Sequence, residues 1–259
     1  MAVLATLGRA LARHLARPRP GHRHGANVDP AVLARTLRRG DVLLVEGDSR
    51  FSSAIKYLTQ STWSHATLYV GERAQGAGRH VRPMLAEVDV EHGVRLVPLS
   101  SVSHYHTRIC RPRGLDEAAV DTLVQYMCQR IGNSYDLKNV LDLARYLIRQ
   151  PPVPSHVRRR LIALGSGEPT KAICSTLIAQ AFDAIAYPIL PDIQSQTVRA
   201  GGHYMRQEIL HIRNYSLYTP RDFDVSPFFD IIKPRLQSGF DYRRLHWSQR
   251  PAPAPGPAT

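Results

Sequence analysis

A histidine and a cysteine, far apart in the sequence, each begin a segment with a regular hydrophobic pattern. His65 opens the alternating run 65–70, which is typical of a β-strand, and Cys174 lies at the head of the apolar stretch 173–186, whose spacing is that of an amphipathic helix. A thiol nucleophile needs a base to accept its proton, and histidine is well suited to that task. The pair therefore predicts thiol chemistry, provided that the fold brings the two side chains together.

Cys174 is better placed to react than the two other cysteines. Unpaired N–H groups and the positive end of the dipole at a helix start favour a thiolate, and Lys171 acts in the same direction. Cys128 falls inside a predicted helix beside apolar residues and is interpreted as a small buried hydrophobe. Cys110 lies in a predicted strand and has no apparent chemical partner. For Cys174 taken alone, core packing remains the alternative.

Glu87 is the candidate for the third member of a triad. If the strand that begins at His65 pairs with a strand over 84–90 about a turn centred near Gln75-Gly76, the residue opposite His65 is Glu87. A cross-strand carboxylate can orient the imidazole and stabilise its protonated form. A register shift of two residues would put Asp89 in that place, and the sequence leaves this choice open.

The elements that must position these residues alternate between strand and helix patterns. A loop is predicted over 71–83, and the overall pattern predicts an α+β fold. The predicted strands cover 42–45, 65–70, 84–90, 94–99 and 105–110, and the predicted helices cover 30–37, 52–58, 115–131, 135–148 and 173–186, with short elements of unassigned type over 209–218 and 228–232.

Composition divides the chain into three parts. Residues 1–38 form a basic N-terminal segment and linker, 39–235 hold the predicted catalytic domain, and 236–259 form a basic, Pro-rich tail that is expected to be disordered. In the first part, Leu4 to Leu15 draw an apolar stripe flanked by arginines, as in a helix that lies on an anionic membrane. No stretch approaches the length of a spanning helix.

Charge and cysteine usage limit the functional classes. The chain of 259 residues carries a net charge of +13, which favours an anionic partner, although solvated surface arginines are an equal alternative. Nucleic acid is a weaker candidate, because zinc-finger spacing, aromatic RNA-binding signatures and a clear helix-turn-helix are not found. Three cysteines form neither a disulfide framework nor a zinc pair, and no metal or cofactor is expected. A cytoplasmic location is expected, with peripheral membrane association left open.

The motifs taken in series resemble a known superfamily. Gly40-Asp41-Val42-Leu43-Leu44, Ser64 to Gly71, Glu87, Gly132 to Leu137 and Ile173 to Leu177 together are similar to the permuted papain-like enzymes of the NlpC-type cysteine peptidase superfamily. The nearest branch is the YiiX/YebB-like proteins, which are related to lecithin retinol acyltransferase. The order histidine, acid, cysteine is the reverse of that in papain, which fits circular permutation.

The resemblance implies a small antiparallel sheet or barrel packed against helices, with Cys174 as nucleophile, His65 as base and Glu87 as orienting group. It also implies that Tyr135 lies near the substrate cleft. The expected function is a cysteine hydrolase that cleaves amide or peptide-like bonds through an acyl-enzyme. The alternatives are a lipid ester hydrolase or acyltransferase at a membrane surface, and a non-catalytic module that binds an anionic ligand. A basic insertion over 149–171 weighs against a peptidoglycan substrate.

Overall fold

The computed structural model describes the larger part of the chain between the two terminal segments. The described residues are 28–75, 80–89, 92–133, 173–200, 203–211, 215–237, 241 and 243. The predicted N-terminal helix, the predicted helix over 135–148, the basic insertion and nearly all of the tail lie outside them. The helices are α2 (Pro30–Thr36), α3 (Arg50–Thr59), α4 (Glu117–Cys128), α7 (Ile173–Asp183), α8 (Pro220–Asp224) and α9 (Pro234–Gln237), with short 3-10 turns η1 (Leu99–Ser101) and η2 (Tyr215–Leu217).

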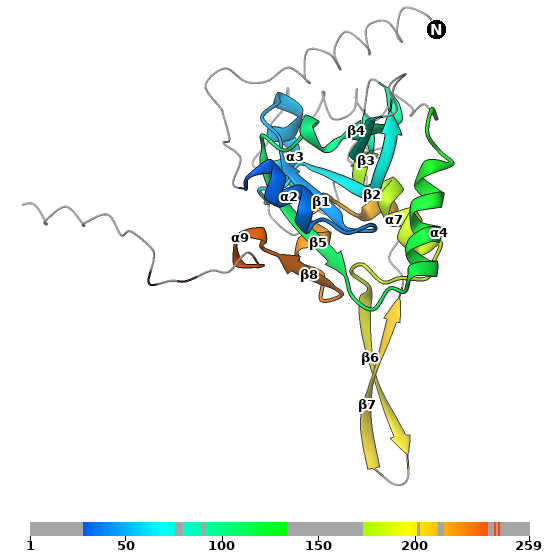
Figure 1. The fold of residues 1–259 in the computed structure, drawn as a ribbon. Coiled ribbons are helices and arrows are strands. Elements are labelled where there is room, and N and C mark those ends of the chain that lie inside the picture. The colour runs from blue at the N-terminus through cyan, green and yellow to red at the C-terminus, as the bar shows by residue number, and fades with distance from the viewer. Residues whose placement is uncertain are drawn as a thin grey trace, which may run out of the picture.

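Antiparallel strands form the centre of the fold. Within the described ranges, six strands make one open sheet in the order β4-β3-β2-β1-β5-β8 (Figure 1). The strands are β1 (Val42–Glu46), β2 (His65–Gln75), β3 (His80–Asp89), β4 (Gly93–Pro98), β5 (His106–Pro112) and β8 (Phe229–Ile232). The predicted α+β class and the permuted papain-like architecture of an antiparallel sheet with helices are confirmed.

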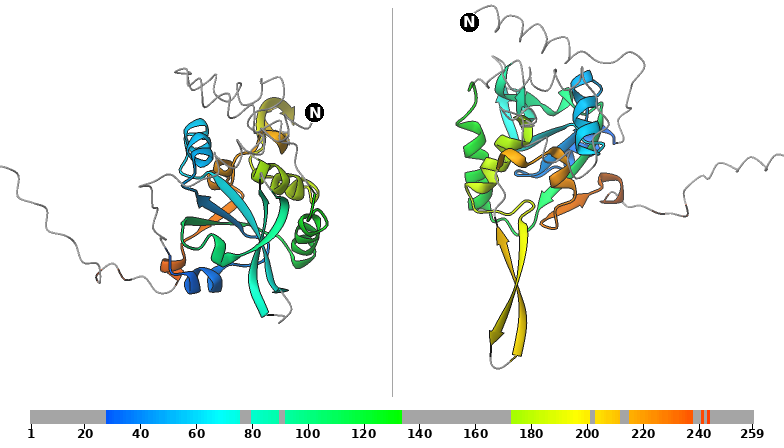
Figure 2. Two further views of the ribbon diagram at one scale, coloured as in Figure 1. Left: turned by 90° about the horizontal axis from the view of Figure 1, so that it is seen from above. Right: turned by 180° about the vertical axis from the view of Figure 1, so that it is seen from behind.

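Both faces of the sheet are covered by packed side chains. Alternate residues of each strand point to opposite faces, and each face has its own core cluster. Ala66, Leu68 and Val70 of β2 belong to the larger core cluster, which includes residues of α4 and α7. Tyr69 points to a second cluster, which includes Leu33 of α2. Seen from above, α4 and α7 lie side by side, and α2 lies across the sheet from them (Figure 2). The sheet is thus the middle of three layers, and α7 is held against it.

Local signals in the sequence define where the helices begin. The Asp116 carboxylate accepts a hydrogen bond from the N–H of Ala119 at 2.8 Å, and the Ser49 hydroxyl accepts one from Ser52 at 3.0 Å, so both helix starts are capped. The helix α3 ends at Thr59 and is followed by the cap residue Gln60, whose φ of 51° is left-handed. These caps explain why the predicted helices 52–58 and 115–131 form close to their predicted positions.

Two regions differ from the prediction. The predicted loop over 71–83 is wrong, because β2 continues to Gln75 and β3 begins at His80, so the two strands pair along most of that segment. The extra ladder consists of backbone hydrogen bonds, which polar and charged residues such as Arg73 and Arg82 make as well as apolar ones do.

The second difference is a separate hairpin that the sequence analysis did not predict as a pair of strands. β6 (Asp192–Ala200) and β7 (His203–His211) pair antiparallel along their whole length and extend away from the body of the protein (Figure 1). Since these strands are long and polar, they lack the apolar alternation on which the prediction relied. In the described ranges, no helix is long and apolar enough to cross a membrane.

Candidate active site

The helix α7 brings Cys174 to the site in its first turn. The first N–H groups of a helix have no partner within it, so a thiolate there lies in a favourable field. The neighbouring Ser175 hydroxyl donates a hydrogen bond to the carbonyl oxygen of Tyr218 at 2.9 Å and is fully buried. This bond fixes the start of α7 against the segment before α8. Cys174 itself is buried, with 5% of its surface exposed.

The strand β2 brings His65 to the same place. Ser64, directly before it, donates its N–H to the carbonyl oxygen of Val45 at 3.1 Å and accepts a hydrogen bond from the N–H of Gly47 at 2.9 Å. His65 then pairs with Val45 in the β1–β2 ladder. The polar residue Ser64 therefore anchors the first residues of β2 to the end of β1, and the position of the histidine backbone follows from it.

Cys174 and His65 form a hydrogen-bonded pair with opposite charges. Burial opposes both charges, since it raises the pKa of the Cys174 thiol and lowers the pKa of the His65 imidazole. The attraction and hydrogen bond between the two groups outweigh burial, so the pKa of Cys174 falls below its ordinary value and that of His65 rises to about 10. The backbones of Ala66 and Ser175 also hydrogen-bond to the sulfur and lower its pKa further. Both shifts favour the form of the pair in which Cys174 is a thiolate and His65 an imidazolium.

Glu87 contacts the histidine from β3. Its Oε2 lies 2.9 Å from Nε2 of His65, and 8% of its side chain is exposed, against 26% for the histidine. Burial raises the pKa of the Glu87 carboxyl, but the bond to His65 and the charges of His65 and Arg95 lower it to below its ordinary value. The carboxylate therefore stays charged and stabilises the imidazolium. The site is open to solvent on the histidine side.

The strand register that produces this contact differs from the predicted one. The β2–β3 ladder pairs Leu68 with Ala86, and the same register continued along both strands puts Glu87 opposite Thr67 and Asp89 opposite His65. Glu87 thus reaches His65 diagonally. Diagonal neighbours in an antiparallel pair are about 7–8 Å apart at the backbone, a distance that a glutamate and an imidazole can span.

The remaining candidates from the sequence have other places. Tyr135 lies outside the described residues. Asp89, the alternative to Glu87, accepts hydrogen bonds from the N–H of His92 at 2.8 Å and from Arg95 at 3.3 Å. Cys110 is fully buried, and burial raises the pKa of its thiol, while Cys128 is half-buried against the core. Of the three cysteines, Cys174 is the one that shares its surroundings with a histidine and a carboxylate.

Two residues at the site were missed by reasoning from the sequence. Ser175 fixes the start of α7, as described above, and Arg95 lies against Glu87, with its Nε 3.0 Å from Oε1. A signal for Arg95 exists in the sequence. A hairpin of the predicted strands 84–90 and 94–99 about position 91 puts Arg95 opposite Glu87, which is the register that the β3–β4 ladder has.

The described part of the chain contains no group of three or more His, Cys, Asp or Glu side chains that could hold a metal ion.

Replacing Glu87 with glutamine is expected to narrow the pH range over which Cys174 is reactive. Without the carboxylate, the pKa of His65 falls from its raised value and the pKa of Cys174 rises, because the imidazolium that stabilises the thiolate is itself less stable. Reaction of Cys174 with iodoacetamide, measured as a function of pH, should lose rate at acidic pH by several-fold, on the order of the effect of one pKa unit.

Asp89→Asn is the matched control, because it removes a carboxylate two residues along β3 that contacts Arg95 and His92. Its reactivity profile should stay close to that of the unaltered protein. A larger shift in Asp89→Asn than in Glu87→Gln would assign the orienting role to Asp89 instead.

Comparison with known proteins gives a match to one family. Residues 36–146 match the family described as permuted papain-like amidase enzyme, YaeF/YiiX, C92 family. This segment includes His65 and Glu87 and ends before Cys174. The comparison with curated proteins found no match.

Among solved structures, the chain is similar to yiiX from Escherichia coli O157:H7, which is described as a metalloprotein. The two are 14% identical, with 76% of this chain and 96% of that chain covered and a TM-score of 0.43. Over residues 36–146, the family match confirms the resemblance to the permuted papain-like YiiX proteins that the sequence predicts.

Proposed function

We propose that this protein is a cysteine hydrolase that cleaves amide bonds, with peptide-like compounds as its substrates. The observation that carries the proposal is the contact of three groups from separate elements: Cys174 from α7, His65 from β2 and Glu87 from β3. The family description, an amidase enzyme, supports the choice of an amide over other carbonyl compounds.

The charges of the pair define the order of proton transfers. The Cys174 thiolate attacks the carbonyl carbon, and the oxyanion that forms accepts hydrogen bonds from N–H groups at the start of α7. The C–N bond then breaks, and the proton held by His65 passes to the leaving amine. This leaves an acyl-enzyme, a thioester on Cys174, and a neutral imidazole.

Water completes the cycle. His65 accepts a proton from a water molecule as its oxygen attacks the thioester carbonyl, the carboxylic acid leaves, and the thiolate–imidazolium pair is restored. Glu87 does not exchange protons in this scheme. It holds the ring with its Nε2 toward the carboxylate, which fixes the other ring nitrogen as the one that faces the reaction.

Labelling with an iodoacetamide-based probe, followed by mapping of the modified residue, tests the proposed nucleophile. At a pH below that at which an ordinary thiol ionises, the probe should modify Cys174 in preference to Cys110 and Cys128, because His65 lowers the pKa of Cys174 whereas burial raises the pKa of Cys110. Preferential labelling of Cys128 would overturn the assignment.

A panel of acyl-aminoacyl aminomethylcoumarin amides tests the type of bond. Release of the fluorophore by the unaltered protein and not by Cys174→Ala supports the amidase. Hydrolysis of long-chain acyl esters in anionic vesicles, without hydrolysis of any amide, would replace it with a lipid ester hydrolase. A labelled Cys174 with no turnover of either class would point to a non-catalytic binding module.

A further inference from the structure

The carboxylate of Glu87 contacts two basic side chains, the imidazole of His65 on one oxygen and the guanidinium of Arg95 on the other. Its Oε2 contacts His65. Its Oε1 accepts a hydrogen bond from Nε of Arg95 at 3.0 Å and lies 2.9 Å from Nη2 of the same residue. One oxygen is thus committed to the guanidinium and the other to the imidazole. Since rotation of the carboxylate would break both sets of hydrogen bonds, its plane is fixed relative to the ring of His65.

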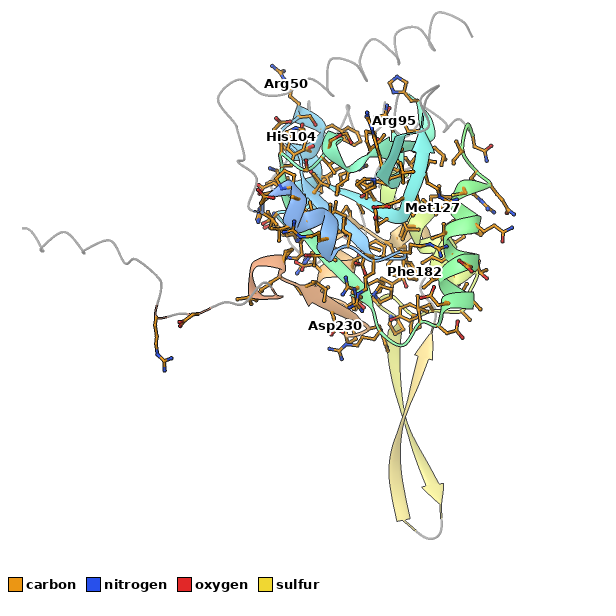
Figure 3. The ribbon with its side chains drawn as sticks, viewed as in Figure 1. Arg50, Arg95, His104, Met127, Phe182 and Asp230 are labelled. Atoms are coloured by element: carbon orange, nitrogen blue, oxygen red, sulfur yellow. The ribbon has the colours of Figure 1, made fainter. Side chains whose placement is uncertain are left out.

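The position of Arg95 follows from the sheet. Glu87 of β3 and Arg95 of β4 are direct partners in the ladder, and Figure 3 labels Arg95 beside these two strands. Directly opposed residues have Cβ atoms about 4.5–5.5 Å apart, which lets the planar guanidinium lie along the carboxylate. Because the two residues are direct neighbours on adjacent strands, the backbone of the sheet sets the geometry of the pair.

The charges around Glu87 come from both neighbouring strands. His65 faces it from β2 and Arg95 faces it from β4, and the guanidinium of Arg95 also contacts Asp89 at 3.3 Å and His92 at 3.4 Å. If His65 were the only positive partner of Glu87, the buried carboxylate would lose that partner whenever His65 gives up its proton. The pKa of Glu87 would then rise, and its neutral form would be favoured. Arg95 stays charged at every step, so it keeps Glu87 ionised when His65 is neutral.

We infer that Arg95 is a positioning residue for the active site: it holds Glu87 ionised and in one orientation, and through Glu87 it maintains the reactive state of His65 and Cys174. This inference rests on the proposed function. Arg95 contacts Glu87 and Asp89, and its effect on the reacting atoms passes through Glu87. It is therefore distinct from the nucleophile and the base.

The test is the pH dependence of the reaction of Cys174 with iodoacetamide in the full chain. The rate rises with pH as the thiol ionises, and this rise is the acidic limb of the profile. Arg95→Met should move the acidic limb to a pH about one unit higher, which is about a tenfold loss of rate at any given pH below it. Arg95→Lys should shift it in the same direction by less, because lysine restores the charge but not the Nε–H hydrogen bond and the Nη2 contact with Oε1. An unshifted profile in both variants overturns the inference.

Arg39→Met is the matched control, because Arg39 is as exposed as Arg95, at 40% against 38%, and pairs with a single carboxylate, Asp121. Its profile should be unchanged. If Arg95→Met does not fold, as judged by thermal unfolding, Arg95→Lys carries the test, and its smaller shift must still be seen.

A double variant separates positioning from a general structural effect. In the Glu87→Gln background, adding Arg95→Met should cause no further shift, since the group through which Arg95 acts is already gone. An equal shift in both backgrounds would overturn the inference. If Glu87→Gln itself leaves the profile unchanged, the proposed triad fails. If Glu87→Gln shifts the profile and Arg95→Met does not, only the role of Arg95 fails.

Discussion

Cys174→Ala is expected to abolish hydrolysis by this protein, with a loss in kcat of at least about 10³-fold for any substrate that the unaltered protein turns over. The reason is that the sulfur forms the covalent bond in the proposed mechanism, and alanine offers no atom that could replace it. p-Nitrophenyl acetate provides a direct measurement, because rapid acylation of a thiolate releases nitrophenolate in an initial burst. The burst should vanish in Cys174→Ala.

Cys128→Ala serves as the control for this result. Cys128 is a half-buried thiol near the end of α4, and it packs against the same core as α7. Its removal should leave both the burst and the steady rate unchanged. A burst that survives in Cys174→Ala and disappears in Cys128→Ala would transfer the nucleophile to α4 and remove the proposed mechanism.

Phe182→Ala is expected to lower the free energy of unfolding by about 3–5 kcal/mol, which is the usual cost of removing a fully buried aromatic side chain and leaving a cavity. Phe182 is completely buried, and its ring centroid lies 5.3 Å from that of Phe229 and 5.4 Å from that of Tyr187. Figure 3 labels it in the interior of the fold. These rings join α7 to the C-terminal segment that contributes β8. Denaturant unfolding followed by circular dichroism measures the change.

Tyr57→Ala is the comparison variant, because Tyr57 is an aromatic residue on α3 with 39% of its surface exposed. Its removal should change the free energy of unfolding by no more than about 0.5 kcal/mol. Equal effects of the two substitutions would mean that the cluster around Phe182 does not hold α7 in place. Because Cys174 lies at the other end of α7, Phe182→Ala should also reduce the selectivity of the iodoacetamide probe for Cys174.

The types and order of the elements near the site could be predicted from the sequence. The alternation after His65 and the apolar period after Cys174 are local patterns, and each reflects burial of one face of a strand or helix. The capping residues Ser49 and Asp116 likewise act within one turn of chain. Local interactions therefore account for the strand that bears the histidine and the helix that bears the cysteine.

The register of β2 and β3 could not be predicted in the same way. The predicted turn is centred near Gln75-Gly76, whereas Gln75 pairs with His80 and the ladder shifts between Tyr69 and Gly71. Gly71 has a φ of 90°, a conformation that side chains other than glycine rarely adopt, so the irregularity has a local cause. Its effect on the pairing of Glu87 depends on how the whole hairpin packs.

The sequence by itself determined which groups could react: one cysteine at a helix start, one histidine at a strand start, and two acids on a neighbouring strand. Only the tertiary structure decided that Glu87 contacts His65 diagonally, that Arg95 holds its other oxygen, and that α7 lies close enough for Cys174 to share a proton with the histidine. The physical reason is that propensity and burial patterns act over a few residues. Distances between side chains on different elements depend on packing and register, which the whole core sets together.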